Sequence, residues 1–159
     1  MQIKFLKDED FTNYRKPSMF IGFPYCDFKC NKDSGKEVCQ NKSLINEPNI
    51  EISIDTIVNR YIENSITCAI VMGGLEPFKS YEDLLALIRG FREKTNDDIV
   101  IYTGYYMTEI IDKIIELEKF DNIIVKFGRY SPNCESHYEP LLGVRLAGVG
   151  QYAVRLNDY

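Results

Sequence analysis

The chain has 159 residues, a length that fits a single domain over residues 1–159. Its residues are 45% hydrophobic and 27% charged and include 11 Tyr and 9 Phe, a composition that excludes a disordered segment. Its net charge of -5 and the absence of a basic run argue against nucleic acid as a partner. Residues 1–10 lack the apolar core of a signal peptide and no stretch approaches ~18 apolar residues, which predicts a cytoplasmic protein that does not enter a membrane.

Four short apolar runs, rich in β-branched and aromatic residues, predict buried strands at 19–21, 66–72, 99–102 and 123–125. Between them, apolar residues recur at helical spacing over 54–62, 84–91 and 111–115. The residues placed where helix N-caps are expected are Ser53, Ser80 and Thr108. This β-α-β-α-β-α-β order predicts an α/β fold, in which flanking helices cover a parallel sheet.

Residues with unusual chemistry follow each predicted strand. The first strand leads into 22–30, which contains two cysteines, and the second leads into Gly-Gly-Leu-Glu-Pro at 73–77. Thr-Gly-Tyr-Tyr follows the third strand at 103–106, and Phe-Gly-Arg-Tyr follows the fourth at 127–130. Because the C-terminal ends of parallel strands lie at the same edge of a sheet, we expect the four loops to meet at one ligand-binding rim.

Cys26, Cys30 and Cys39 form a triad that stands apart from the other two cysteines. Because a reducing compartment disfavours disulfides, clustered thiols indicate metal binding, and three thiolates at this spacing can hold a 4Fe-4S cluster. Three ligands leave one iron free to chelate the amine and the carboxylate of S-adenosylmethionine. Electron transfer to the sulfonium would then yield a 5'-deoxyadenosyl radical and methionine.

Two other interpretations of the triad remain open. It could form a structural zinc site with Cys134 or His137 as the fourth ligand, although Cys-x2-Cys knuckles are absent. It could also consist of unliganded buried cysteines, which is our interpretation of Cys68, inside a predicted core strand. Cys134 is expected to be a free loop thiol, and His137, the only histidine, has no predicted catalytic role.

Charged residues near the predicted rim are further candidates for ligand contact. Arg129 and Arg145 could each bind a carboxylate through a bidentate fork. Glu76 could contact a ribose or an amine. Asp97 and Asp98, by contrast, are interpreted as solvated charges in a turn.

With these motifs in place, the chain resembles the radical S-adenosylmethionine superfamily, and within it the activating proteins of anaerobic class III ribonucleotide reductases. That family has a Cys-x3-Cys-x2-Cys loop after the first strand, then a Gly-Gly-acidic-Pro motif, and later Thr-Gly-Tyr-like and Asp-Gly-x-Tyr-like segments. The counterparts here are the cysteine triad with Asn41 after it, Gly73-Gly74-Leu75-Glu76-Pro77, Thr103-Gly104-Tyr105 and Gly128-Arg129-Tyr130. The resemblance covers nearly the whole length and implies a partial (β/α) barrel.

The resemblance also implies a set of cofactors and partners. The cofactors are a 4Fe-4S cluster and S-adenosylmethionine, whose methionine amino group packs against the double glycine, here Gly73 and Gly74. The other residues assigned to the same site are Glu76, Pro77, Thr103 and Arg129. The partner is the large glycyl-radical subunit of the reductase, from which the radical removes a glycine hydrogen. Flavodoxin or ferredoxin is the expected electron donor.

Four features depart from the family pattern. Eight residues, rather than two, separate the second and third cysteines, and Val38 holds the position that lies near the adenine in the family. Leu75 is an extra residue before the acid, and Phe127 stands where the family often has Asp. The segment 148–151 only partly resembles the family's Ser-x-Asn-Gln ending, so contacts with the partner's glycyl loop could differ.

Two alternative functions stay open at this point. The first keeps the radical chemistry and directs it at another glycyl-radical enzyme or at a small molecule such as a deazapurine precursor. The second is a non-catalytic interaction module that binds zinc through the triad.

Overall fold

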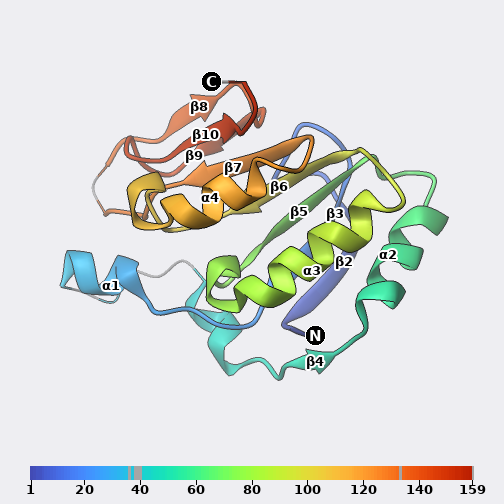
Figure 1. The fold of residues 1–159 in the computed structure, drawn as a ribbon. Coiled ribbons are helices and arrows are strands. Elements are labelled where there is room, and N and C mark those ends of the chain that lie inside the picture. Colours follow the sequence, from blue (N-terminus) through green and yellow to red (C-terminus); the bar gives the residue numbers. More distant parts are fainter. Residues whose placement is uncertain (36, 38–40, 133, 159) are drawn as a thin grey trace.

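The computed structural model describes residues 1–35, 37, 41–132 and 134–158, and its centre is one six-stranded sheet (Figure 1). The strand order is β10-β7-β6-β5-β3-β2. The four inner strands are β3 (Ser18–Phe23), β5 (Ala69–Gly74), β6 (Asp98–Tyr102) and β7 (Ile123–Phe127). Each pairs with its neighbour in parallel, which confirms the four predicted strands and their common direction.

Antiparallel strands form both edges of this sheet, so it is mixed rather than wholly parallel. At one edge, β2 (Phe5–Asp10) pairs with β3, and at the other, β10 (Tyr152–Arg155) pairs with β7. The remaining strands form two small antiparallel pairs, β1 (Gln2–Ile3) with β4 (Ile50–Glu51) and β8 (His137–Glu139) with β9 (Val144–Leu146). The α/β class is confirmed, while the partial barrel stays an expectation, because β2 and β10 do not pair with each other.

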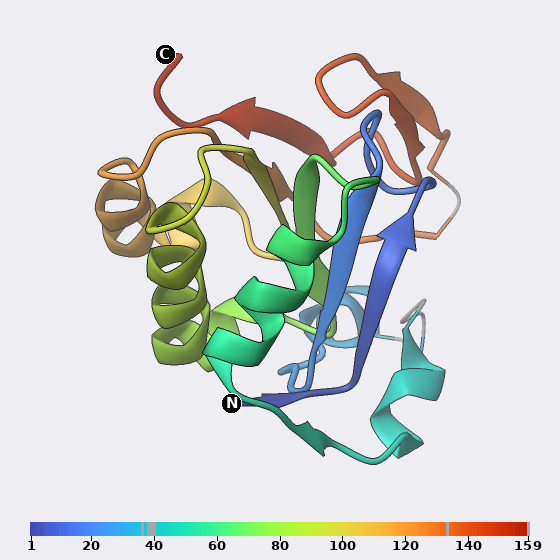
Figure 2. The same ribbon diagram turned by 90° about the vertical axis from the view of Figure 1, so that its right-hand side faces the viewer.

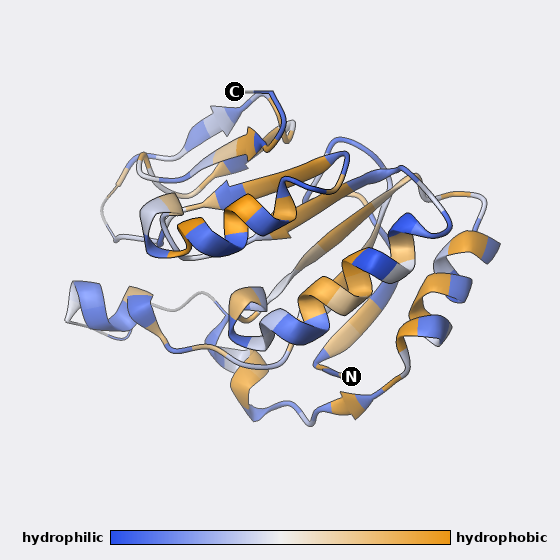
Figure 3. Ribbon diagram, viewed as in Figure 1, coloured by the Kyte–Doolittle hydropathy of each residue, from blue (hydrophilic) through white to orange (hydrophobic). Residues whose placement is uncertain are grey.

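Three helices cover one face of the sheet, as Figures 1 and 2 show. They are α2 (Ile54–Glu63), α3 (Tyr81–Arg92) and α4 (Ile111–Leu117). A fourth, α1 (Lys29–Ser34), follows the first cysteines and is mostly hydrophilic, in contrast to the apolar inner strands (Figure 3). Short 3-10 helices occur at η1 (Lys42–Asn46), η2 (Pro77–Ser80) and η3 (Met107–Glu109). None of the helices in the described part of the chain is long and apolar enough to cross a membrane.

The helix starts agree only partly with the predicted caps. Ser53 is the N-cap of α2, and its hydroxyl accepts a hydrogen bond from the Thr56 amide at 3.1 Å. Ser80 precedes α3 but makes no side-chain cap, because η2 runs directly into the helix. Thr108 lies within η3, and α4 begins only at Ile111, so the cap predicted there is wrong.

Side chains alternate between the two faces of the inner strands. On the helical face, Ile70 and Met72 of β5 join the larger apolar core with residues of all three covering helices. On the opposite face, Ala69 and Val71 pack with Tyr14 and with apolar residues of the β8–β9 hairpin. The hairpin covers only part of this second face, which leaves room for the cavity described below.

Two predictions about individual residues are wrong. Cys68 is exposed, because β5 begins one residue later, at Ala69. Asp98 is buried, with 6% of its surface exposed, and its carboxylate accepts hydrogen bonds from partners far away in sequence. Its donors are Tyr14 Oη at 2.6 Å, Lys16 Nζ at 2.9 Å and Arg155 Nη1 at 3.0 Å. Asp98 of β6 therefore binds the segment of Tyr14 and Lys16 and also strand β10, and it is no solvated turn charge.

Candidate functional site

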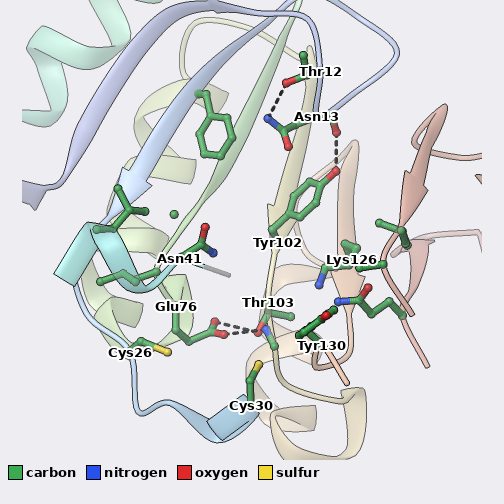
Figure 4. A pocket seen from close by; sticks show the side chains of 18 of the residues that line it. Thr12, Asn13, Cys26, Cys30, Asn41, Glu76, Tyr102, Thr103, Lys126 and Tyr130 are labelled. Atoms are coloured by element: carbon green, nitrogen blue, oxygen red, sulfur yellow. Dashed lines mark hydrogen bonds between the residues drawn. The ribbon is translucent and has the colours of Figure 1, made fainter. Parts of the chain in front are cut away.

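A cavity of about 640 Å³ lies against the face of the sheet that carries the β8–β9 hairpin (Figure 4). Its position is fixed by Phe20 and Tyr102, which line it and belong to the apolar cluster of that face. Residues of the loops after β3, β5, β6 and β7 all line it, so the predicted convergence of the four loops at one rim is what the structure shows. Among them are Cys26, Cys30, Gly74, Glu76, Thr103 and Gly128.

The first two cysteines of the triad open onto this cavity. Cys26 and Cys30 are both half-buried, and the Phe28 amide donates a hydrogen bond to Cys26 Sγ at 3.3 Å. Phe28 adopts the left-handed conformation, with φ of 57°, where the chain turns into α1. Amide hydrogen bonds to sulfur favour the thiolate, which is the form that binds iron.

The third cysteine, Cys39, lies outside the described residues, as does Val38. Within the described ranges, no group of three His, Cys, Asp or Glu side chains surrounds a metal position. The donor set nevertheless fits an iron-sulfur cluster, because two thiols of the triad line the same cavity and thiolates are the usual ligands of such clusters. Asn41, the first described residue after that cysteine, also lines the cavity.

Glu76 ties the loop after β5 to the loop after β6. Its side chain is 5% exposed, and its oxygens accept hydrogen bonds from Thr103 Oγ1 at 2.8 Å and from the Gly104 amide at 2.8 Å. The Phe78 amide adds a third donor at 3.1 Å. Burial raises the pKa of this carboxyl, and the three donors act in the opposite direction. Glu76 and Thr103, both assigned to ligand binding from sequence, thus bind each other at the cavity wall.

The double glycine lies at the end of β5, where β3 approaches closely. Gly74 has φ of 81°, and a Cβ on it would lie 2.8 Å from the Gly22 Cα, so a side chain is excluded. A Cβ on Gly73 would meet the Phe20 ring and the Tyr102 Cβ at 3.4 Å, which is an ordinary contact. Pro77 is buried at the start of η2 and does not line the cavity.

Arg129 lies at the outer side of the rim rather than in the cavity. It forms ion pairs with Asp33 of α1 and, at 2.6 Å, with Glu109, and its guanidinium lies 4.4 Å from the centre of the Tyr106 ring. It is not among the residues that line the cavity. Although partial burial raises the pKa of Glu109, hydrogen bonds led by the one from Arg129 lower it to about 2. Arg129 therefore fastens α1 to the loop after β6.

Lys126 is a cavity residue that the sequence analysis missed. It is 7% exposed, and its Nζ donates a hydrogen bond to the Gly128 carbonyl at 3.1 Å. Burial lowers the pKa of this amine to about 8, although the charges of Glu76 and Cys30 oppose the shift. The available signal was a single basic residue inside the otherwise apolar run Ile-Ile-Val-Lys-Phe.

The residues suggested as fourth zinc ligands lie elsewhere. Cys134 is exposed, and neither it nor His137 lines the cavity. The His137 Nδ1 is buried without a hydrogen-bond partner among the described residues, next to the second strand of the hairpin. The structure therefore does not bring either residue to the first two cysteines.

Comparison with known proteins gives one match. The model of a family described as a 4Fe-4S single cluster domain matches residues 17–143, a segment that includes all three cysteines of the triad. No curated protein and no solved structure matches the chain. The matched segment runs from the start of β3 to the turn of the β8–β9 hairpin, so it contains the whole parallel part of the sheet.

Proposed function

Since the chain belongs to the family of 4Fe-4S single cluster domains, we propose that Cys26, Cys30 and Cys39 hold one such cluster and that the chain uses it to cleave S-adenosylmethionine. The observation that carries the proposal is the shared cavity, in which two of these thiols meet Gly74 and Glu76 from another strand. A bound cluster would supply the electron that cleaves the sulfonium into methionine and a 5'-deoxyadenosyl radical.

The residues of the chain supply binding and positioning for this reaction. The Phe28 amide stabilises the Cys26 thiolate, and a fourth cluster position without a protein ligand would accept the amine and carboxylate of S-adenosylmethionine. Gly74 lines the cavity, and a Cβ on the neighbouring Gly73 would point toward Phe20 and Tyr102 of the cavity wall, so we assign this pair to the methionine end of the ligand. The hydrogen bonds between Glu76 and the loop after β6 hold the rim in place around the ligand.

The proposed target is a glycine of the large glycyl-radical subunit of an anaerobic ribonucleotide reductase. The support is the order of motifs along the chain, which resembles that of the activating proteins of that enzyme, together with the mostly parallel α/β sheet. The sheet would then be an open form of the partial (β/α) barrel typical of radical S-adenosylmethionine enzymes. A flavodoxin or a ferredoxin would deliver the electron.

A second candidate keeps the radical chemistry and replaces the protein target with a small molecule. One observation favours it: the cavity continues from the cysteines to Thr12 and Asn13, beyond the residues assigned to S-adenosylmethionine. Its volume of about 640 Å³ is within the range of about 300–1,000 Å³ found for small-molecule sites. Co-purification with a large glycyl-radical subunit would favour the protein target.

The test starts with protein reconstituted with iron and sulfide under anaerobic conditions. We expect about four irons and four sulfides per chain with broad visible absorption, and formation of 5'-deoxyadenosine on adding dithionite and S-adenosylmethionine. Cys30→Ala should abolish both cluster and product, while the matched control Cys68→Ala, at an exposed position outside the cavity, should retain both. Cluster-loaded protein that forms no 5'-deoxyadenosine would overturn the proposal.

The same samples address the zinc module. Stoichiometric zinc without iron or sulfide in anaerobically purified protein would support that reading, which family membership disfavours. Cys39→Ala separates the two further, because loss of a structural zinc ligand should unfold the protein, whereas loss of a cluster ligand should abolish turnover and leave the core folded.

A further inference from the structure

Lys126 carries a positive charge into the cavity from the penultimate position of β7. The other residues of this strand are apolar, and the strand lies between β6 and β10. The partner of Lys126 in register on β6 is Tyr102, whose ring centre lies 5.7 Å from Nζ. Figure 4 shows the Lys126 side chain directed into the cavity beside Tyr102 and Tyr130.

This ammonium is only partly satisfied by the protein. It has three N–H donors, and the one hydrogen bond found for it in the described part of the chain goes to the Gly128 carbonyl. No carboxylate among the described residues forms an ion pair with it. Burying a charge without an ion pair is costly, and the nearby charges of Glu76 and Cys30 offset only part of that cost, so the site favours a further anion in the cavity.

The two carboxylates that line the cavity are already engaged by other donors. Glu76 accepts three hydrogen bonds at the rim, two of them from backbone amides. Asp10, which is 1% exposed, accepts hydrogen bonds from Lys7, Thr12 and Asn13. Asp10 and Glu76 form no ion pair with Lys126, and Glu76 acts on it only through its charge, so its ammonium retains donors for an anionic group of a ligand.

We propose that Lys126 is an anion-binding residue that receives a carboxylate of the ligand held in the cavity. The inference deepens the proposed function and rests on it for the identity of that ligand. The sequence offered Arg129 and Arg145 for this role. Arg129 is occupied by Asp33 and Glu109 outside the cavity, and Arg145, which lines the cavity, donates hydrogen bonds to the carbonyl and the hydroxyl of Ser136. The carboxylate belongs either to the methionine end of S-adenosylmethionine or to a second molecule bound beside it.

Three variants and two kinds of measurement test the site. Lys126→Met removes the charge at nearly constant length, Lys126→Arg retains the charge, and Lys119→Met is an exposed control outside the cavity. Circular dichroism and iron content establish that each variant folds and holds its cluster. Binding of S-adenosylmethionine and of its methyl ester to anaerobic cluster-loaded protein is then measured by equilibrium dialysis.

A separate experiment labels the amines of the wild type with acetic anhydride while S-adenosylmethionine is bound. Mass spectrometry compares the labelling of Lys126 and Lys119 with and without acetate.

If the carboxylate is that of methionine, Lys126→Met should weaken S-adenosylmethionine binding at least tenfold. Lys126→Arg should bind S-adenosylmethionine within several-fold of the wild-type affinity. The methyl ester, which lacks the carboxylate charge, should bind the wild type and Lys126→Met equally weakly. If it belongs to a second molecule, S-adenosylmethionine should bind both proteins equally, and acetate should slow labelling of Lys126 but not of Lys119. If neither effect occurs, the anion site does not exist.

The two proposals can fail separately. Wild-type protein that holds its cluster but does not bind S-adenosylmethionine would contradict the proposed function. In the same protein, protection of Lys126 by acetate would still show whether the anion site exists. If Lys126→Met does not fold, the methyl ester and acetate measurements on the wild type decide the matter alone.

Discussion

The Thr103 hydroxyl donates a hydrogen bond to the Glu76 carboxylate across 2.8 Å, between residues 27 positions apart in the chain. The neighbouring Gly104 amide donates to the other carboxylate oxygen, so two loops at the ends of adjacent parallel strands are joined by one side chain. Because Glu76 is almost fully buried, water cannot replace these contacts if they are lost.

Glu76→Gln should therefore destabilise the fold. In the wild type the carboxylate oxygens accept from the backbone amides of Phe78 and Gly104. In the variant the side-chain NH2 would face one of these amides, and a buried donor left without an acceptor costs about 1–3 kcal/mol. Thr103→Val removes one hydrogen bond and should lower the free energy of unfolding by about 1 kcal/mol. Urea denaturation of the two variants and of the double variant measures these losses and their coupling. A Glu76→Gln protein as stable as the wild type would show that the carboxylate is not the tie between the loops.

The two adjacent glycines should respond differently to Ala. At Gly74 the positive φ and the contact with Gly22 both oppose a side chain, so Gly74→Ala should lower stability by about 1–3 kcal/mol. Gly73→Ala should fold like the wild type but weaken S-adenosylmethionine binding, because its methyl group would separate the ligand from the main chain. Thermal unfolding and ligand binding on the same samples test the pair. Equal effects of the two changes on both measurements would contradict this assignment.

Asp98 predicts a defined pH dependence of stability. Burial raises its pKa, but hydrogen bonds from Arg155, Tyr14 and Lys16 outweigh burial and hold it well below the ordinary value of 3.8. The folded state thus favours the carboxylate, so this stabilisation is present in full above the unfolded pKa and is lost as the pH falls through the folded pKa.

Asp98→Asn should accordingly be less stable than the wild type by about 3–5 kcal/mol at pH 7, since it leaves buried cations without their partner. The difference should shrink as the pH falls below the ordinary Asp value. Urea denaturation from pH 7 to pH 3 provides the measurement, with the exposed Asp121→Asn as a control. A difference that does not change with pH would mean that the charge of Asp98 is not what stabilises the fold.

Arg129 should affect retention of the cluster more than ligand affinity. It links Asp33 of α1 to Glu109, and α1 follows directly on the first two cysteines. Removing the guanidinium by Arg129→Met frees α1 and should speed the loss of iron to a chelator several-fold. The rate can be followed by the colour of a ferrous chelator, with exposed Arg89→Met for comparison. Loss of S-adenosylmethionine affinity without faster iron release would instead support the role assigned from sequence.

The inner strands and the meeting of their loops could be predicted from sequence because strands buried on both faces are continuous apolar runs. The edge strands could not. β2 contains Lys7, Asp8 and Glu9 in succession, as suits an edge that faces water, and it therefore lacks an apolar signal. β10 and the hairpin before it are short and half-exposed, and their pairing depends on strands distant in the chain.

The sequence predicted where the candidate site lies, but it predicted the roles of individual charged residues less well. Gly74 and the first two cysteines lie at the cavity as expected from their loops. Whether a charged residue serves a ligand or the protein depends on its neighbours, and those neighbours lie far away in sequence. Arg129 is engaged by Asp33 of α1 and Glu109 of η3, while Lys126 forms no ion pair in the described part of the chain. No local pattern could distinguish these two cases.

Helices α2, α3 and α4 cover one face of the sheet only, and the cavity lies on the opposite face (Figure 2). Residues of the β8–β9 hairpin and of η1 border this cavity, as does Cys30. The outward surfaces of α2, α3 and α4 are consequently the place to attach a fluorophore, a spin label or a tether, where the attachment leaves the approach to the cysteines clear.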